Sequence, residues 1–572
     1  MKFLWSYFKK YRLESILAPL FKCLEACFDL AVPVIVAKII DTGIATANKP
    51  YIISRFLLLL AMAVLGLVSS CVAQYFAAKA AIGTAAGLRQ DLLCKIQTLS
   101  CGEVDAVGTS TLITRMTSDV NQVQNGLNMF LRLFMRSPFI VFGAMIMAFT
   151  INARLALIFV IAIAVLFFIV FGVMWLSNPL YKKVQQQLDG VTEATREDLN
   201  GVRVIRAFSR EGEQKKRFAA QNERLLHAQL FVGRVAAIMN PLTYLIVNAV
   251  IIAVLWLGAG KIQNGVLLSG SIIALINYIL QILVELVKLA NLITQLGRSV
   301  ASMNRVGQVL SLQSGMQFGG GSQPQAGAPA VQFNNVSFCY NGSAEPALQN
   351  ISFTAQKGQT IGVIGGTGSG KTTLVNLILR FYDATSGTVL VNGVSVQSLS
   401  KQQLEQAVSA VLQRPRLFSG TVKSNLQLAA PQATEQQMLW ALRLARAEDF
   451  VLEKGGLDAA VEQDGANFSG GQRQRLTIAR TLLSGAKIII LDDSLSALDF
   501  ATDAAVRRAL KTLPKDVTVF FISQRVGSIA GADRILVLDD GALVGSGTHS
   551  ALLQSCGVYR EIFESQTKGA EA

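Results

Sequence analysis

The chain has 572 residues, of which 51% are hydrophobic and only 16% are charged, and its mean hydropathy is +0.43. This composition is too apolar for a wholly soluble protein, and it predicts a membrane segment joined to a soluble one. The formal net charge is +15, but the basic residues mostly flank apolar spans, so the positive-inside rule accounts for them without a nucleic-acid partner.

The N-terminal segment, residues 1–12, mixes aromatic and basic residues and lacks the apolar core of a signal peptide. We therefore expect an interfacial helix there, on the cytoplasmic leaflet. Runs of roughly 18 or more apolar residues then predict membrane spans. The basic connections 79–127 and 178–234 predict cytoplasmic coupling loops, with both termini on the same side. The six expected spans are approximately 15–40, 56–78, 128–151, 155–177, 235–260 and 266–290.

Polar side chains inside two of these spans are candidates for substrate contact, because a charge in the membrane interior is costly and must face protein or water. Lys22, Glu25 and Asp29 share one face of the first predicted helix. For this face, a cavity wall and a self-neutralising Lys22–Glu25 ion pair both remain open. For the last span, the polar residues on one helix face favour a cavity wall. The predicted cavity residues are Glu25, Asp29, Asn277, Gln281 and Glu285.

Residues 313–330 are rich in Gly, Gln, Pro and Ala, and they predict a flexible linker. The linker divides the chain into a membrane domain, residues 1–312, and a soluble domain, residues 331–572. In the soluble domain, short apolar runs typical of strands alternate with helical segments, which predicts an α/β fold.

Residues 365–372 read G-x-x-x-x-G-K-[ST], the phosphate-binding loop, and they lie between the expected strand 360–364 and a helical segment. The glycines leave backbone N–H groups free to face a phosphate, and the helix N-terminus adds a partial positive charge. Lys371 would hold the β- and γ-phosphates, and Thr372 would give its hydroxyl to Mg²⁺. The predicted nucleotide contacts here are Gly365, Gly366, Thr367, Gly368, Ser369, Gly370, Lys371, Thr372 and Thr373.

Two further motifs strengthen this interpretation. The apolar run 487–491 predicts a buried strand that ends at Asp492, whose carboxylate can hold Mg²⁺ through water. A Gly-rich turn opens another helical segment, and its exposed N–H groups suit a second phosphate contact. This turn consists of Ser469, Gly470, Gly471 and Gln472.

With these motifs in place, the whole chain resembles the ATP-binding-cassette (ABC) exporters, and in particular the degenerate-site subunit of heterodimeric bacterial multidrug exporters. The stretches 110–119 and 200–208 are similar to intracellular loops of that family. The resemblance implies an all-α six-helix transmembrane domain followed by an α/β P-loop nucleotide-binding domain that uses ATP and Mg²⁺. It also implies that Tyr340 stacks on adenine, that Gln413 contacts Mg²⁺, that the loop ending at Asp499 crosses a dimer interface, and that helices near 107–112 and 207–214 are couplers.

Two positions depart from the family pattern at the reaction centre: Asp493 stands where the family usually has a catalytic Glu, and Gln524 stands where it usually has His. The Glu orients and polarises the attacking water. Aspartate is one methylene shorter, and a displacement of about 1 Å can cost about 10²-fold in rate. Gln524 can hydrogen-bond a γ-phosphate but cannot carry positive charge. We therefore expect ATP binding to survive and hydrolysis to be poor.

The family pairs its nucleotide domains head to tail, so each site takes its phosphate loop from one chain and its Ser-Gly-Gly-Gln turn from the other. The prediction is a subunit of a heterodimeric exporter in a bacterial plasma membrane, with a different partner that has Glu and His. Amphipathic drugs or lipids suit the cavity. The alternatives are a homodimeric lipid, drug or peptide exporter, an ATP-gated regulator that does not pump, and a soluble protein acting on DNA or ribosomes, against which the uncharged spans argue.

Overall fold

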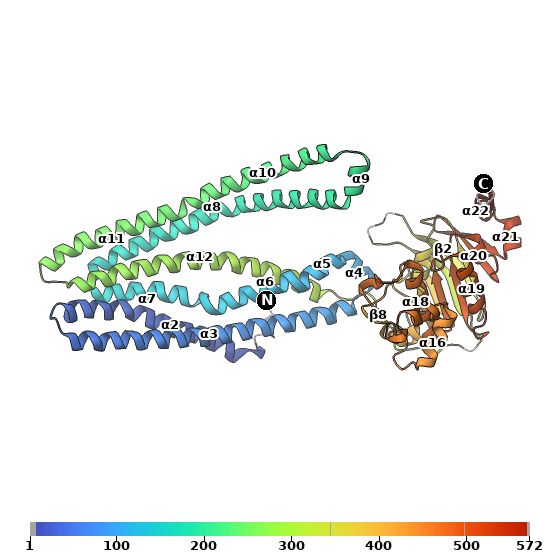
Figure 1. Cartoon of the computed structure of the whole chain (residues 1–572), viewed down its shortest axis with the longest axis horizontal. Coiled ribbons are helices and arrows are strands. Elements are labelled where there is room, and N and C mark those ends of the chain that lie inside the picture. The colour runs from blue at the N-terminus through green and yellow to red at the C-terminus, as the bar shows by residue number, and fades with distance from the viewer. Residues whose placement is uncertain are drawn as a thin grey trace. The chain divides into compact units, whose positions relative to one another are not determined.

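The computed structural model describes residues 7, 9–325, 327–341, 343, 345–496 and 498–568. Of the interfacial helix expected over 1–12, residues 1–6 and 8 lie outside the described residues. The chain forms two compact units, here called the helical unit (residues 1–97 and 110–312) and the nucleotide unit (residues 98–109 and 313–572). Figure 1 follows the chain through both units by colour.

The helical unit is built from long helices. Within the described residues, five helical segments are long and apolar enough to cross a membrane: Lys49–Thr98, Thr109–Ile151, Ala153–Asn200, Glu211–Gln263 and Ser269–Ser311. The first expected span lies in α2 (Arg12–Lys38). This helix is not among the five because Lys22, Glu25 and Asp29 make its middle too highly charged.

These helices continue far beyond the thickness of a bilayer. α3 (Lys49–Thr98) has 50 residues, about 75 Å at a rise of about 1.5 Å per residue, against a hydrocarbon core of roughly 30 Å. The expected loops 79–127 and 178–234 are therefore mostly helical. The other helices are α5 (Thr109–Thr114), α6 (Val120–Met129), α7 (Arg136–Ile151), α8 (Ala153–Asn200), α9 (Val202–Ala207), α10 (Glu211–Ala237), α11 (Met239–Gln263) and α12 (Ser269–Ser311), with π-helical turns at Ile39–Ile44, Arg115–Asp119 and Phe130–Phe134.

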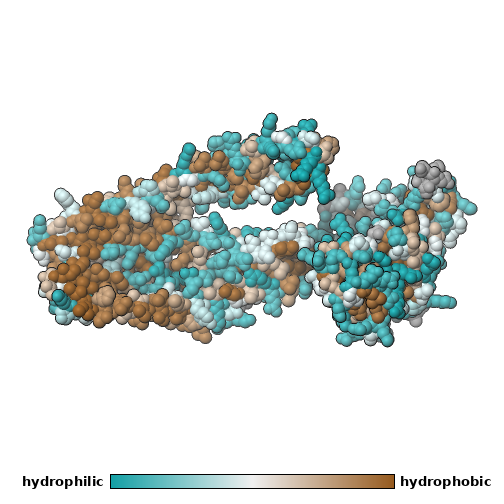
Figure 2. Space-filling model, viewed as in Figure 1, coloured by the Kyte–Doolittle hydropathy of each residue, from teal (hydrophilic) through white to brown (hydrophobic). Residues whose placement is uncertain are grey.

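α12 is the most buried of these spans. Half of its apolar stretch is buried, and it packs against α2, α6, α7, α8 and α11. Buried apolar residues recur along it at intervals of three and four, from Leu275 to Leu286, as expected for a helix enclosed by neighbours. Tyr278 is fully buried and donates its hydroxyl hydrogen to the Leu30 carbonyl over 2.6 Å. Figure 2 shows apolar side chains gathered over the end of the unit that contains α11 and the start of α8.

The stretch 107–112, expected to be one short helix, spans the last residue of α4 (Cys101–Val107) and most of α5 (Thr109–Thr114), which are separated at Gly108. α4 begins at a capping box, in which the side chains of Ser100 and Glu103 each accept from the backbone N–H of the other. It ends at Gly108, whose φ of 84° favours glycine. The stretch expected at 207–214 likewise crosses a break, between α9 and α10, where Ser209 has a φ of 54°. Local capping and backbone geometry thus set the limits of both helices.

The main sheet of the nucleotide unit has the strand order β12-β11-β3-β10-β9-β6, and all neighbours except β12 and β11 are parallel. Alternate residues of β9 (Ile488–Asp492) pack into two hydrophobic clusters: Ile489 and Leu491 into one, Ile488 and Ile490 into the other. Both faces of the sheet are therefore covered, as parallel sheets require. The other strands are β3 (Thr360–Ile364), β6 (Val408–Val411), β10 (Thr518–Ile522), β11 (Arg534–Asp539) and β12 (Ala542–Gly547).

An antiparallel sheet of order β2-β1-β4-β5 and a strand pair β7–β8 complete the unit. These strands are β1 (Val331–Phe338), β2 (Leu348–Ala355), β4 (Ser386–Val391), β5 (Val394–Ser395), β7 (Gly420–Thr421) and β8 (Ala460–Val461). The helices are α13 (Lys371–Ile378), α14 (Lys401–Ala407), α15 (Val422–Gln427), α16 (Glu435–Leu444), α17 (Glu448–Glu453), α18 (Gly470–Leu483), α19 (Phe500–Leu510), α20 (Val526–Ile529), α21 (His549–Ser555) and α22 (Gly557–Lys568), with 3-10 turns at Gly456–Asp458 and Gln463–Gly465.

The segment 313–330 has no helix or strand among its described residues, as its composition predicts. Backbone hydrogen bonds nevertheless hold parts of this segment against the rest of the nucleotide unit. The N–H of Gly319 donates to the Leu399 carbonyl over 3.1 Å, and the N–H of Ala330 donates to the Ala355 carbonyl over 2.9 Å. The linker is thus irregular in shape but fixed along part of its length.

Candidate functional site

The carboxyl ends of four parallel strands bring the predicted nucleotide residues together. The phosphate loop follows β3, Asp492 ends β9, and Gln524 lies just beyond β10. Gln413 follows β6, which pairs with β9. Because strands that run the same way end at the same edge of a sheet, residues that are far apart in the sequence meet there.

A cavity of about 330 Å³ lies at this edge. It takes in most of the predicted ATP-contacting residues together with both departures from the family pattern. Its lining consists of Tyr340, Ala347, Thr367, Gly368, Gly370, Lys371, Thr372, Thr373, Gln413, Asp492, Asp493, Ile522, Ser523 and Gln524. Three residues predicted in the phosphate loop, Gly365, Gly366 and Ser369, are absent from this lining, although they contact Lys371.

The phosphate loop cradles the ammonium group of Lys371. Its Nζ donates to the carbonyl oxygens of Gly365 and Gly366 over 2.9 and 2.5 Å, and to Oγ of Ser369 over 3.3 Å. Burial lowers the pKa of Lys371, while the nearby carboxylates of Asp492 and Asp493 oppose that shift. A cation is thereby held at the N-terminus of α13, where the helix dipole also favours an anion.

Asp492 has the environment of a cation ligand. It is 2% exposed, and burial raises its pKa to about 6 while a hydrogen bond from Thr372 opposes the shift, so it is mainly ionised at pH 7. Within the described residues, its Oδ2 is buried without a hydrogen-bond partner. Mg²⁺ prefers oxygen ligands, and Thr372, Gln413 and Asp492 supply a hydroxyl, an amide and a carboxylate. These residues fit Mg²⁺, whose charge would neutralise the phosphates when bound.

Asp493 lies beside Asp492 with a φ of 45°, a left-handed conformation that aspartate tolerates better than most residues. Its backbone N–H donates to the Ile522 carbonyl over 2.9 Å, which ties it to the end of β10. Burial raises the pKa of its carboxyl group, and hydrogen bonds from Ser496 and Gln413 are among the effects that oppose this. The carboxylate is therefore placed in the cavity, next to the phosphate loop.

Tyr340 takes part in an aromatic cluster at one side of the cavity. Its ring meets those of Phe338 and Tyr382 edge to face, with centroids 4.7 and 5.2 Å apart. Its hydroxyl lies 3.2 Å from Oγ1 of Thr373 and accepts from Nδ2 of Asn376 over 3.3 Å. The sequence reasoning missed Asn376, although its position three residues after Thr373 places both on one helix face. Stacking of Tyr340 on adenine stays a prediction.

The predicted interface motifs do not line this cavity. Ser469 is the exposed N-cap of α18 and forms a capping box with Gln472. Asp499 is the exposed N-cap of α19 and accepts from the backbone N–H and the hydroxyl of Thr502, both over 2.8 Å. Both motifs therefore present helix N-termini at the surface, where a second molecule can reach them.

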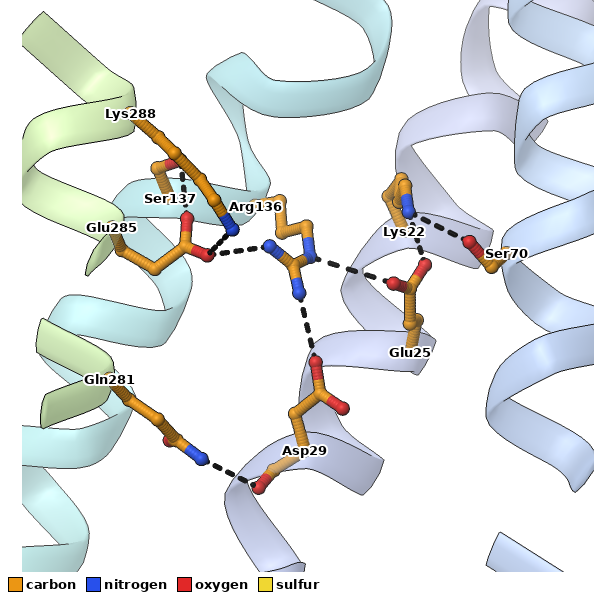
Figure 3. A network of polar contacts seen from close by, with 9 residues as sticks. All are labelled: Lys22, Glu25, Asp29, Ser70, Arg136, Ser137, Gln281, Glu285 and Lys288. Carbon is orange, nitrogen blue, oxygen red and sulfur yellow. Dashed lines mark hydrogen bonds and ion pairs between the residues drawn. The ribbon is translucent and has the colours of Figure 1, made fainter. Parts of the chain in front are cut away.

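In the helical unit, all of the predicted cavity residues except Asn277 belong to a polar network between α2, α7 and α12 (Figure 3). Arg136 is at its centre: its guanidinium lies 2.6 Å from Glu285, 2.9 Å from Asp29 and 3.8 Å from Glu25. Lys22 pairs with Glu25 over 2.5 Å, so the ion pair left open by the sequence is present. The sequence reasoning missed Arg136 as a partner, although an arginine near the start of a span is itself a signal.

This network contains both enclosed and accessible charges. The side chains of Arg136 and Glu285 are 12% and 4% exposed, whereas those of Asp29 and Lys288 are each 44% exposed. A cavity of about 320 Å³ is lined by Asp29, Arg136, Ile140, Asn277, Leu280, Gln281, Val284, Glu285 and Lys288. Asn277 donates to the Ile273 carbonyl of its own helix over 2.9 Å. Glu25 does not line this cavity.

A helical membrane unit joined to an α/β unit with a phosphate loop defines a nucleotide-driven membrane protein. Residues 15–286 match the family model of the ABC transporter transmembrane region, and residues 348–496 match that of the ABC transporter. The chain is 35% identical to an uncharacterised ABC transporter ATP-binding protein of Mycobacterium tuberculosis, over 99% of this chain and 98% of that protein. It therefore belongs to the ABC transporter family.

Two further likenesses agree with this assignment. The chain is 29% identical to the ATP-dependent lipid A-core flippase of Haemophilus influenzae, over 99% of this chain and 97% of that protein. Its fold is shared with a bacterial Atm1-family ABC exporter with ATP bound, with a TM-score of 0.79 at 22% identity and 98% coverage of both chains. The chain is thus a membrane-embedded ABC exporter with an ABC ATPase domain.

Proposed function

We propose that this chain is one subunit of a heterodimeric ATP-driven exporter of the bacterial plasma membrane, with both termini cytoplasmic. Its own phosphate loop would form a site that binds ATP and hydrolyses it slowly. The observation that carries the proposal is the pair of departures, Asp493 and Gln524, in a cavity whose other predicted nucleotide residues are intact. Two changes at one reaction centre favour a specialised site over unrelated drift.

The residues of the cavity support binding more than hydrolysis. Lys371 and the N-terminus of α13 provide positive charge for the phosphates. Asp493 is the carboxylate placed to orient a water, but its shorter side chain stops about 1 Å short of where a glutamate would reach. Gln524 offers a neutral amide in place of a cation. ATP would therefore be held at this site while the partner's site hydrolyses.

The turn Ser469–Gln472 would complete the partner's site. Its position outside this chain's own nucleotide cavity, with Ser469 and Gly470 exposed, supports that role. A free helix N-terminus with glycines suits contact with the phosphates of a nucleotide bound elsewhere. The partner would be a different half-transporter that carries Glu and His at the positions of Asp493 and Gln524.

Helix α4 provides a route from nucleotide binding to transport. The Tyr382 hydroxyl donates to the Asp105 carboxylate, and the backbone N–H of Gly315 donates to Oε1 of Glu103 over 2.7 Å. The segment 98–109 is thereby bound to the nucleotide unit, so closure of two nucleotide domains around ATP would move this segment and the spans on either side of it. Such closure would switch the access of the membrane cavity.

The substrate would be an amphipathic lipid or drug. The membrane cavity exposes one carboxylate, Asp29, and one ammonium group, Lys288, beside apolar residues. The buried Oε1 of Gln281 is an acceptor that lacks a partner within the described residues. The name of the related flippase, which acts on lipid A-core, also supports an amphiphile. Glu285 in the wall and Glu25 behind it would instead hold the surrounding helices together through Arg136.

Purified without a partner, the chain is expected to bind Mg·ATP yet hydrolyse it about 10²-fold more slowly than the assembled complex. Nucleotide binding and ATPase activity are measured on the same preparation, with Lys371→Ala as the variant that loses binding. The partner is sought by copurification from the source bacterium and among the genes next to this one. Turnover by the chain alone at the rate of the complex would contradict the heterodimer and favour a homodimer.

A cationic amphiphile such as tetraphenylphosphonium is expected to stimulate the ATPase of the complex. In Asp29→Asn, the concentration needed for half-maximal stimulation should rise about three- to tenfold, because an exposed carboxylate is removed without loss of volume. Glu14→Gln is the matched control: Glu14 is on the same helix, outside the cavity, and pairs with Lys79 over 2.9 Å. An unchanged response of Asp29→Asn would exclude this carboxylate from substrate binding.

A further inference from the structure

The side chain of Gln566, in the C-terminal helix α22, bridges the loop that carries Gln524. Its Nε2 donates to the Gln524 carbonyl over 2.7 Å, and its Oε1 accepts from the Val526 N–H over 2.9 Å. The two backbone groups lie on either side of Arg525. A carboxamide carries one donor and one acceptor side by side, so it satisfies both groups at once.

Gln566 is fixed to a well-packed helix. Tyr559 of α22 is fully buried, and its hydroxyl lies 2.7 Å from Nδ1 of His549 in α21. Ile562 and Phe563 pack against the same hydrophobic cluster as Tyr559. Residues 559, 562, 563 and 566 follow helical spacing, so Gln566 continues this face at its exposed end, beside the loop after β10. α22 also packs against α20, which begins at Val526.

A structural role alone accounts for only one of the two hydrogen bonds. Val526 is the first residue of α20, and the N-cap residue Arg525 supplies no side-chain cap. The Oε1 of Gln566 provides the acceptor that such a helix start needs. The second bond, from Nε2 to the Gln524 carbonyl, does not cap the helix. It restrains the residue whose side chain lines the nucleotide cavity.

We propose that Gln566 is a positioning residue that holds Gln524 toward the γ-phosphate end of the nucleotide cavity. The C-terminal helix thereby takes part in distinguishing ATP from ADP. The inference rests on the role proposed above for Gln524 as a γ-phosphate contact, and it does not depend on the identity of the partner subunit.

The test is equilibrium binding of Mg·ATPγS and Mg·ADP to the full-length purified chain. Gln566→Met keeps the length of the side chain and removes both hydrogen bonds. We expect it to weaken ATPγS binding about five- to tenfold and to leave ADP binding unchanged. Gln566→Glu keeps the acceptor for Val526 but loses the donor to Gln524. It should therefore lose the preference for ATPγS while keeping the melting temperature of the wild type.

Ser565→Ala is the matched control, because the Ser565 hydroxyl donates within its own helix, to the Ile562 carbonyl, over 2.8 Å. A double-mutant cycle then asks whether Gln566 acts through Gln524. If it does, Gln566→Met has no further effect on ATPγS binding in a chain that already carries Gln524→Leu.

Three outcomes would overturn the proposal. The first is an equal loss of ATPγS and ADP affinity in Gln566→Met, which indicates general damage to the domain. The second is wild-type discrimination in Gln566→Glu, which reduces Gln566 to a helix cap. In the third, Gln524→Leu weakens ATPγS binding but Gln566→Met does not. The inference about Gln566 then fails, although the role of Gln524 is upheld. No effect of Gln524→Leu would instead refute that role.

Discussion

The double variant Asp493→Glu with Gln524→His is expected to raise ATP hydrolysis at this chain's own site by about 10²-fold. The added methylene brings the carboxylate about 1 Å closer to an attacking water, and the imidazole restores a group that can carry positive charge beside the γ-phosphate. The rise is measured in a complex whose other site has been inactivated, so that turnover reports this site alone.

Asp493→Asn is the control for this variant, since it keeps the length of the side chain and removes the carboxylate. It should lower the residual rate. The replacement by Glu also acts on the backbone, because position 493 has a φ of 45° and glutamate is less common than aspartate in that region. Mg·ATP binding is therefore measured alongside hydrolysis. Intact binding with no rise in rate would contradict our account of Asp493 and Gln524.

Much of the nucleotide site could be predicted because its geometry follows from local rules. The phosphate loop needs a strand before it and a helix after it, and both are visible as apolar patterns around residues 365–372. The same reasoning placed Asp492 at the end of a buried strand. The topology of a parallel sheet then brings these loops to one edge, so that short motifs far apart in the sequence meet in one cavity.

What the sequence could not predict depends on tertiary packing. Arg136 stands at the start of an apolar run and is easily interpreted as its boundary. Its three acidic neighbours come from two other helices, and only the packing of α2, α7 and α12 brings them together. Gln566 follows no motif at all. Its role comes from the docking of α22 beside the loop after β10.

The two stretches expected to be short helices, 107–112 and 207–214, are each divided by a break, for a different reason. The capping box of Ser100 and Glu103 and the glycine at 108 were both present in the sequence. These local signals divide the stretch 107–112 between the end of α4 and most of α5. Local capping signals thus predict the limits of α4, which the resemblance to the family does not give.

Arg136→Met is expected to cause the largest loss of stability of any single substitution in the membrane cavity, about 3–5 kcal/mol. Methionine fills a similar volume but leaves the buried carboxylate of Glu285 without its shortest ion pair, and it leaves Glu25 and Asp29 close together without the cation between them. Lys288 and Ser137 still contact Glu285 over 2.9 and 2.7 Å, so the loss stays below the cost of a fully isolated charge. Unfolding of the purified chain in mixed micelles measures the change.

Arg132→Met separates loss of the ion-pair network from loss of an arginine near the same helix end. Arg132 donates to Oδ1 of Asn128 over 3.4 Å, so its removal should cost about 1 kcal/mol or less. Adding Glu285→Gln to Arg136→Met should recover more than half of the lost stability, because the penalty comes mainly from an uncompensated buried charge. If Arg136→Met costs no more than Arg132→Met, the network does not hold α2, α7 and α12 together. Its carboxylates would then be available to a cationic ligand, and the assignment of Glu285 to the wall rather than to the substrate would have to be reversed.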